Sequence, residues 1–253
     1  NKLVKMTSHL YKIYYTRRMD MKSSQSDYKK RGMLDMNLCN QLQEASYKEL
    51  IDTLQSSHAD WRTACIHLLS KKYNTHPQFT DVLLQQLVKE KALYTKIEIQ
   101  TQLSQYGQIS KMCQYLGCIG DNQYRAIPLR GSKKKSYPLP RDLIARSLAH
   151  MEVQRFQDFF VELPQLSYSQ LLEAIDAFGF LCFYHQSLVN KETYEYIKTC
   201  ILNYWDDDLM LWKLMTCLSA FPMAIDLLQE LQTQQKHPTI LMEVERSLKL
   251  LIN

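Results

Sequence analysis

The sequence predicts an all-α protein, built as a right-handed α-α superhelix of about five to six helical pairs. Two observations lead to this fold class. The 253 residues include only 6 glycines and 7 prolines, too few for the many turns of a β-sandwich or barrel. Apolar residues make up 45% of the chain and recur at the helical period. Helices with one apolar face cannot bury it alone, so stacking against neighbours is expected.

The individual helices follow from apolar stripes read in chain order. Trp61, Ala64, Cys65, Leu68 and Leu69 lie at i, i+3, i+4, i+7 and i+8, which predicts a helix over 58–72 with one core-facing side. The next stripe, 79–87, follows a proline at 77 that suits a first helical turn. Serine 167 is a suitable N-cap for the stripe at 171–182. The same spacing recurs at 194–204, 211–218, 224–231 and 241–251.

A basic residue recurs in the second helix of five of the six predicted pairs, all except 152–190, and indicates a repeat. Arg62, Lys96, Arg146, Lys213 and Arg246 are separated by 34, 50, 67 and 33 residues. The interval of 67 equals about two units, and the interval of 50 equals one unit plus an insertion. A two-helix period of about 30–40 residues is typical of helical solenoids. Six units are expected, at 37–76, 77–107, 108–151, 152–190, 191–221 and 222–253.

One segment resembles the second helix of a HEAT repeat, which often opens with Asp, two variable residues, a small apolar residue, Arg, two more residues and Ala. The stretch 142–149, with Asp142, Ala145, Arg146 and Ala149, fits that pattern. Residues 58–65 fit it in part, with Arg62 in register. The resemblance implies a HEAT-like solenoid in which the Asp and Arg serve packing between repeats. The similarity to uncharacterised bacterial HEAT-repeat proteins implies no particular activity.

The domain organisation expected is a basic leader, 1–36, and a HEAT-like α-solenoid, 37–253, with an inserted loop at 117–140. The loop contains three of the glycines and three of the prolines, and it is longer than a helix connection requires. Between 121 and 142, six cations outnumber Asp121 and Asp142, a net charge of +4. The cations form a basic stretch, 125–141, made of Arg125, Arg130, Lys133, Lys134, Lys135 and Arg141.

The leader concentrates positive charge, since residues 1–32 contain nine Lys or Arg against two Asp, a net of +7. With Tyr11, Tyr14 and Tyr15 it is typical of the cytoplasmic flank of a membrane anchor. The chain starts at Asn1 rather than Met, which favours a native N-terminus further upstream. A cytoplasmic protein tethered to a membrane surface is one hypothesis, and a solvated basic leader of a cytoplasmic protein is the other.

Motifs for catalysis, metals or cofactors are not found in the sequence, so we expect neither a catalytic residue nor a metal ion or cofactor. The seven cysteines are scattered over apolar helical stretches, which predicts free core thiols in a reducing compartment. The acidic run 206–208 suits a helix start. A less favoured enzyme hypothesis is a HEAT-like DNA glycosylase, which would use Trp205 beside this run.

The function expected is therefore that of a non-enzymatic scaffold that binds a protein or peptide partner on the solenoid surface. The concave face, lined by second helices, should include Arg62, Lys96, Arg146 and Lys213, if packing does not consume them. The alternative is nucleic-acid binding through the basic stretch, where Tyr124 and Tyr137 are interleaved with cations. Residues 33–253 together have a net charge of −2, which makes nucleic acid the less favoured partner.

Overall fold

The computed structural model describes residues 24–235 and 237–252, and within them every regular element is a helix and none is a strand. The α-helices are α2 (Gln25–Lys30), α3 (Met36–Gln41), α4 (Tyr47–Thr53), α5 (Ala59–Tyr73), α6 (Phe79–Lys89), α7 (Leu93–Tyr106), α8 (Ile109–Cys113), α9 (Leu143–Ala149), α10 (Phe156–Phe160), α11 (Tyr168–Tyr184), α12 (Lys191–Asn203), α13 (Asp208–Leu218), α14 (Ile225–Gln234) and α15 (Pro238–Ile252). Short 3-10 helices are η2 (Val153–Arg155), η3 (Leu163–Gln165), η4 (Gln186–Leu188) and η5 (Pro222–Ala224). The predicted all-α class is confirmed for these residues.

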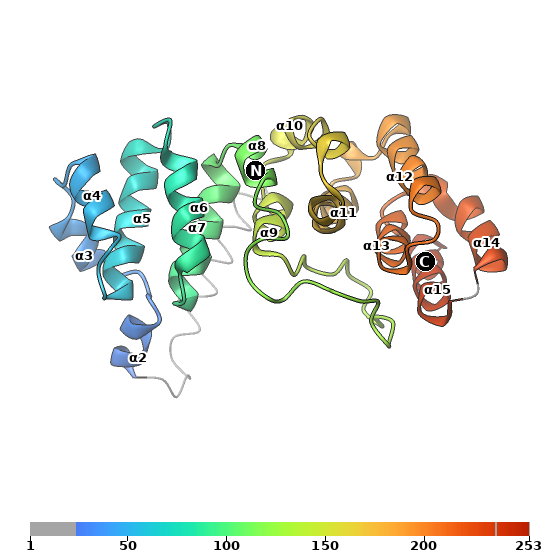
Figure 1. Ribbon diagram of the computed structural model, residues 1–253, viewed down its shortest axis with the longest axis horizontal. Coiled ribbons are helices and arrows are strands. Elements are labelled where there is room, and N and C mark those ends of the chain that lie inside the picture. The colour runs from blue at the N-terminus through green and yellow to red at the C-terminus, as the bar shows by residue number, and fades with distance from the viewer. Residues whose placement is uncertain (1–23, 236, 253) are drawn as a thin grey trace.

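The helices form an elongated array in which neighbours along the chain pack together (Figure 1). One row consists of α5, α7, α9, α11, α13 and α15, each in contact with the next. Helices α4, α6, α8, α12 and α14 pack on the row as the first members of pairs, and α10 packs on α8. The basic residues chosen from the repeat, at 62, 96, 146, 213 and 246, all lie on row helices.

Capping residues set where several helices begin. Ser167 is the N-cap of α11, and Gln170 Oε1 accepts hydrogen bonds from its amide and its hydroxyl. Asp207 is the N-cap of α13, and its Oδ1 accepts from the amide of Met210 at 2.8 Å. The predicted capping role of the acidic run is therefore confirmed at Asp207, where the carboxylate satisfies an amide that the helix leaves free.

The apolar stripes form one continuous core that runs along the array. Phe178 and Leu211 are 0% and 1% exposed, as their stripes predict. The rings of Phe156 and Phe160 lie 5.7 and 6.0 Å from that of Phe178, so an aromatic cluster joins α10 to α11. Trp61 differs from the prediction, because it is only partly buried and does not belong to this core.

Part of the expected leader belongs to the helical array. The backbone turns at Gly32 with a φ of +78°, and a Cβ atom there would overlap Thr95 Oγ1 in α7. Its carbonyl accepts a hydrogen bond from Thr63 Oγ1 at 2.7 Å, and that of Arg31 accepts from the Tyr94 amide at 2.9 Å. Residues 24–36 are thus tied to α5 and α7. The predictions on Tyr11, Tyr14 and Tyr15 concern residues outside the described part.

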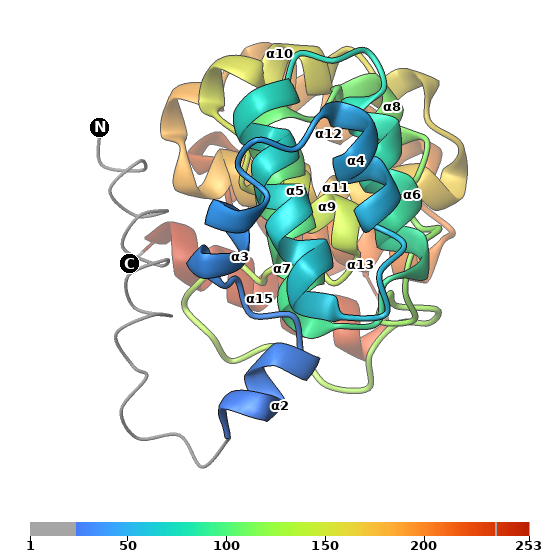
Figure 2. The same cartoon turned by 90° about the vertical axis from the view of Figure 1, so that its left-hand side faces the viewer.

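The inserted loop leaves the array after α8 and returns to it at α9 (Figures 1 and 2). It runs along the lower side of the array in these views, and its tip projects below α13 and α15. None of the helices in the described residues is long and apolar enough to span a bilayer.

Candidate interaction surfaces

Arg62 does not face a partner, because Glu90 and the chain before α5 occupy its guanidinium. Its Nε and Nη2 bind the two carboxylate oxygens of Glu90 at 2.8 and 2.7 Å, and Nη1 donates to the carbonyl of Ser56 at 2.8 Å. The hydrogen bonds with Glu90 raise the pKa of Arg62. Its side chain is 15% exposed. Arg62 therefore joins two neighbouring units and contributes little to the surface.

Lys213 is fully enclosed at the contact between α13 and α11. Its Nζ lies 3.1 Å from Glu173 Oε1, 3.0 Å from Asp176 Oδ2 and 2.8 Å from the carbonyl oxygen of Leu172. Burial alone would lower the pKa of Lys213, but the two carboxylates outweigh it and raise that pKa. With a side chain 1% exposed, Lys213 cannot be part of the predicted concave surface.

The remaining two residues of the predicted concave surface are partly buried. Arg146 donates from Nε to the carbonyl of Pro140 at 3.0 Å, and burial lowers its pKa. Lys96, on α7, makes no ion pair within 24–235 or 237–252. Of the four expected cations, Lys96 is thus the only one whose charged end is not engaged by the described part of its own chain.

The aspartate of the HEAT-like stretch is buried and accepts hydrogen bonds within the fold, so it is not a surface group. Asp142 is 0% exposed, and its Oδ1 accepts from the amides of Ile144 and Ala145 at 2.9 and 2.8 Å. Its Oδ2 accepts from the amide of Gly117 at 3.2 Å and from Gln123 Nε2 at 2.8 Å. Asp142 therefore caps α9 and also holds the start of the inserted loop.

Two contacts fix the far end of the inserted loop on the array. Tyr137 is 3% exposed, and its hydroxyl lies against Gly179, where a Cβ atom would overlap it. Arg246, in α15, donates from Nε to the carbonyl of Lys134 at 3.1 Å and from Nη2 to that of Ser136 at 2.9 Å. The backbone of 134–137 is consequently held between α11 and α15.

The cations of the basic stretch remain at the surface around this fixed backbone. Arg125, Arg130, Lys133, Lys134, Lys135 and Arg141 are all exposed. Arg125 lies 3.7 Å from Asp121, and Arg141 lies over the ring of Tyr124 at 4.3 Å. Tyr124 in turn packs edge-on against Trp212, with ring centroids 5.0 Å apart. Both tyrosines of the loop, Tyr124 and Tyr137, are therefore engaged in packing.

A group of exposed and partly exposed rings lies on α11 and at the C-terminal end of α9, and we name it the aromatic surface: His150, Phe180, Phe183 and Tyr184. The ring centroid of Tyr184 is 4.6 Å from that of Phe180 and 5.2 Å from that of Phe183. His150 lies 5.4 Å from Phe180. Tyr184 is 48% exposed, and Phe180 and Phe183 are partly exposed. Clustered accessible rings of this kind are typical of protein-binding surfaces.

The aromatic surface was not among the predicted sites, although its spacing is present in the sequence. Phe180, Phe183 and Tyr184 are spaced i, i+3 and i+4, which places them on one side of α11. The stripe that includes Phe178 already accounts for the buried side of that helix. A second apolar stripe on one helix indicates a second contact surface.

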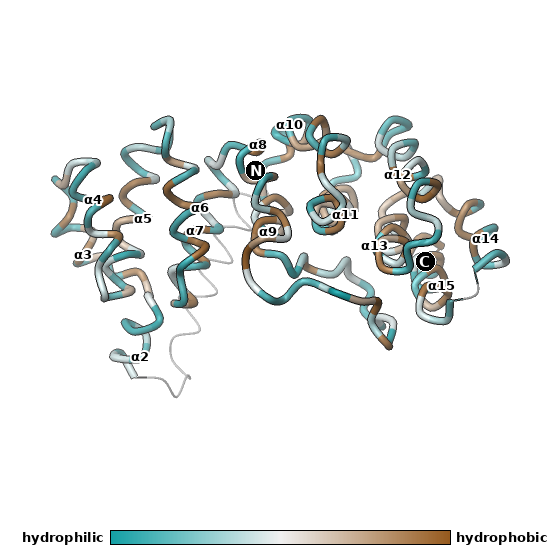
Figure 3. The backbone as a smooth tube through the Cα atoms, in the orientation of Figure 1, coloured by the Kyte–Doolittle hydropathy of each residue, from teal (hydrophilic) through white to brown (hydrophobic). Residues whose placement is uncertain are grey.

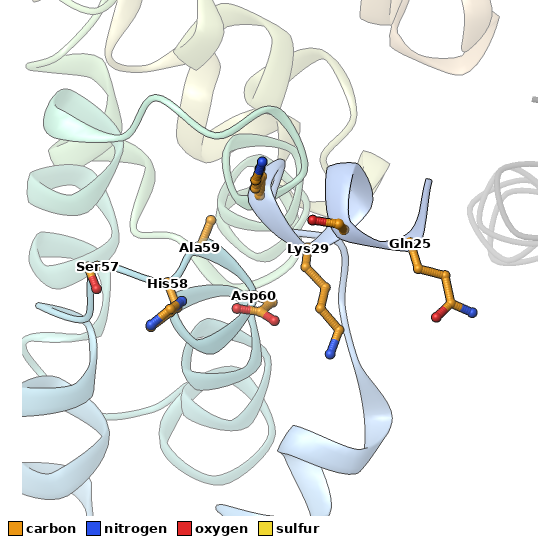
Figure 4. A pocket seen from close by; sticks show the side chains of 8 residues that line it. Gln25, Lys29, Ser57, His58, Ala59 and Asp60 are labelled. Atoms are coloured by element: carbon orange, nitrogen blue, oxygen red, sulfur yellow. The ribbon is translucent and has the colours of Figure 1, made fainter. Parts of the chain in front are cut away.

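A shallow depression lies between α2 and the start of α5 (Figure 4). It is lined by Gln25, Ser26, Lys29, Lys30, Ser57, His58, Ala59 and Asp60. Lys29 is 4.0 Å from the carboxylate of Asp35, and Asp60 accepts from the amide of Trp61 at 3.0 Å. Lys29 and Asp60 therefore have partners on their own chain.

All seven cysteines are free, and six of them are buried. Burial raises the pKa of Cys65 and of Cys113 to about 12, which keeps these thiols protonated and unreactive at neutral pH. Cys118 is exposed, which differs from the predicted core position. In the part of the chain that the structure describes, no three His, Cys, Asp or Glu side chains gather so as to hold a metal ion.

Comparison with models of known protein families gave no match. Comparisons with curated proteins and with solved structures also gave no match. The resemblance to HEAT repeats therefore rests on residues 142–149 and on the spacing of the basic residues, and it stays a prediction.

Proposed function

We propose that this chain is a HEAT-like solenoid with a right-handed superhelical path, and that it acts as a non-enzymatic scaffold. The packing of α5, α7, α9, α11, α13 and α15 in one row, with first helices packed beside it, supports the solenoid. Arg62 and Lys213 bridge adjacent units, a packing role that the HEAT resemblance implies for repeat arginines. An elongated array offers a long surface, which suits a binding protein.

The observation that carries the scaffold proposal is the aromatic surface on α9 and α11. Its rings come from row helices, the layer expected to face a partner, and Tyr184 leaves half of its surface to solvent. Burying an aromatic side chain in an interface contributes about 1.5–3 kcal/mol. The partner we propose is a protein or peptide that places apolar side chains against Phe180, Phe183 and Tyr184.

The test is quantitative affinity capture from source-cell lysate, followed by titration of the purified captured protein. The Tyr184→Ala/Phe180→Ala variant should lose binding by at least about tenfold, as expected for hot-spot aromatics. The matched control is Tyr106→Ala on α7, a tyrosine that is 44% exposed outside the aromatic surface. The proposal would be overturned by a captured protein that binds the wild type, the double variant and the control with the same affinity.

A further inference from the structure

Leu129 is an apolar side chain that the fold leaves in solvent. It is 94% exposed, the highest exposure of any large hydrophobic side chain in 24–235 and 237–252. Figure 3 shows a hydrophobic stretch at the tip of the inserted loop, below the array. Arg130 follows it directly, and Lys133, Lys134 and Lys135 come within six residues. An exposed leucine beside a cluster of cations suits a partner that offers both an apolar region and negative charge.

Charge at this surface is more one-sided than the sequence suggests. Asp142 is buried as the cap of α9, so its carboxylate does not offset the exposed cations. Within residues 121–142, six exposed cations then stand against one exposed acid, Asp121, a net charge of +5 for the exposed side chains of this segment. The complementary partner is a strongly anionic surface.

The backbone beneath these cations is held in place, so little conformational entropy is lost on binding. Arg246 fixes the carbonyls of Lys134 and Ser136, and Tyr137 is buried against Gly179. These contacts engage the backbone and one tyrosine, and they leave the three lysine side chains exposed. A preorganised loop binds more tightly than one that must first be ordered.

The loop's chemistry favours a lipid bilayer over nucleic acid. Nucleic-acid surfaces combine cations with rings that stack on bases. Here Tyr137 is buried, and both Arg141 and Trp212 lie against Tyr124. The exposed side chain between the cations is instead a leucine, which an acyl-chain boundary accepts and a phosphate backbone does not.

We propose that the inserted loop docks on an anionic bilayer, with Leu129 entering the lipid interface and Lys133, Lys134 and Lys135 contacting the headgroups. Helix α2 lies on the same lower side of the array as the loop tip (Figures 1 and 2). It adds the exposed Lys29 and Lys30 to that side. The loop adjoins the aromatic surface, because Tyr137 packs beside Phe180 and Phe183.

The test is co-sedimentation of the full chain with vesicles, either one-third phosphatidylserine in phosphatidylcholine or phosphatidylcholine alone. A cation near an anionic bilayer changes affinity roughly fivefold, so Lys133→Ala/Lys134→Ala/Lys135→Ala should weaken binding roughly 100-fold. Leu129→Ser should weaken it roughly tenfold or more. Binding should also weaken as salt rises.

Matched controls distinguish an effect of the loop from the general effect of removing exposed lysines or an exposed leucine. Lys48→Ala/Lys91→Ala/Lys191→Ala removes three exposed lysines elsewhere, and Leu202→Ser removes a leucine that is 77% exposed on α12. Both controls should retain binding far better than the loop variants.

Three results would overturn the proposal. The first is vesicle binding that both loop variants leave unchanged. The second is a loss with the lysine variant and none with Leu129→Ser, which would exclude insertion of the leucine. The third is that the lysine variant weakens binding to a single-stranded oligonucleotide but leaves binding to vesicles unchanged. A Leu129→Trp variant adds a direct readout, since its additional fluorescence should shift to the blue only with anionic vesicles.

Discussion

The phenol of Tyr137 lies against the backbone of Gly179, in the middle of α11, where no Cβ atom would fit. This relationship explains a glycine in a helix interior, a position where glycine is usually unfavourable. It also fixes the path of the inserted loop, because the ring is held beside Phe180 and Phe183 at centroid distances of 6.3 and 5.6 Å.

We expect Gly179→Ala to destabilise the protein by roughly 1–3 kcal/mol, because overpacking displaces Tyr137. Helix propensity alone predicts the opposite sign, a gain of about 1 kcal/mol. Urea unfolding measures the difference, and trypsin should cleave the loop lysines faster. In a Tyr137→Ala background the alanine should no longer destabilise. A stabilised single variant would contradict the packing described here.

Replacing Lys213 should reveal a buried ion-pair network. Lys213→Met leaves the carboxylates of Glu173 and Asp176 without a cation, and we expect a loss of roughly 3–5 kcal/mol in urea unfolding. Lys96→Met is the control, and it should change stability by no more than about 0.5 kcal/mol. Adding Glu173→Gln and Asp176→Asn to Lys213→Met should recover much of the loss. Equal losses at Lys213 and Lys96 would contradict the network.

The pH dependence of stability should depend on Glu173. Burial raises the pKa of Glu173 from 4.5 to about 7, although Lys213 acts in the opposite direction. The folded state therefore holds this proton more tightly than the unfolded state, and the free energy of unfolding falls as pH rises from about 4.5 to 7. Glu173→Gln should match the wild type near pH 4.5 and exceed it by roughly 1–3 kcal/mol at pH 8. Parallel pH profiles for the two proteins would refute the assignment.

The two apolar sides of α11 should respond differently to truncation. Phe178→Ala empties a core position that is 0% exposed, and we expect a loss of roughly 3–5 kcal/mol. Tyr184→Ala removes a ring that is 48% exposed and should cost less than about 1 kcal/mol. Thermal unfolding monitored by circular dichroism compares the stabilities of the two variants. Similar losses would mean that the aromatic surface belongs to the core.

The helices and their buried sides could be predicted because both depend on local spacing. Ser167 and Asp207 were identifiable as caps, and Phe178 as core, from residues within one or two turns. The fate of Arg62 could not be foreseen in this way, since its partner Glu90 is 28 residues away. Lys213 is similar, with Glu173 at a separation of 40 residues. A sequence shows where a cation recurs, but its partner depends on how the units are stacked.

The course of the inserted loop was the least predictable part. Its length and glycines indicated an insertion, but its anchoring depends on an absent side chain at Gly179 and on Arg246 in the last helix. Arg246 was noticed only as a recurring basic residue, and nothing around either position indicates a contact with the loop. The spacing of Phe180, Phe183 and Tyr184 indicates the aromatic surface, but the residues that this surface contacts depend on the folded loop and not on local sequence.

The bond between Arg246 and the Lys134 carbonyl joins positions 112 residues apart. In an array whose units touch only their neighbours, stability adds unit by unit, and an end can open independently. Here α15 is closed onto a loop that begins beside α9, so opening it also breaks a contact with a distant unit. The helices from α9 to α15 should therefore unfold as one cooperative block, and they should fold more slowly than a purely local stack, because a long-range contact must form to complete them.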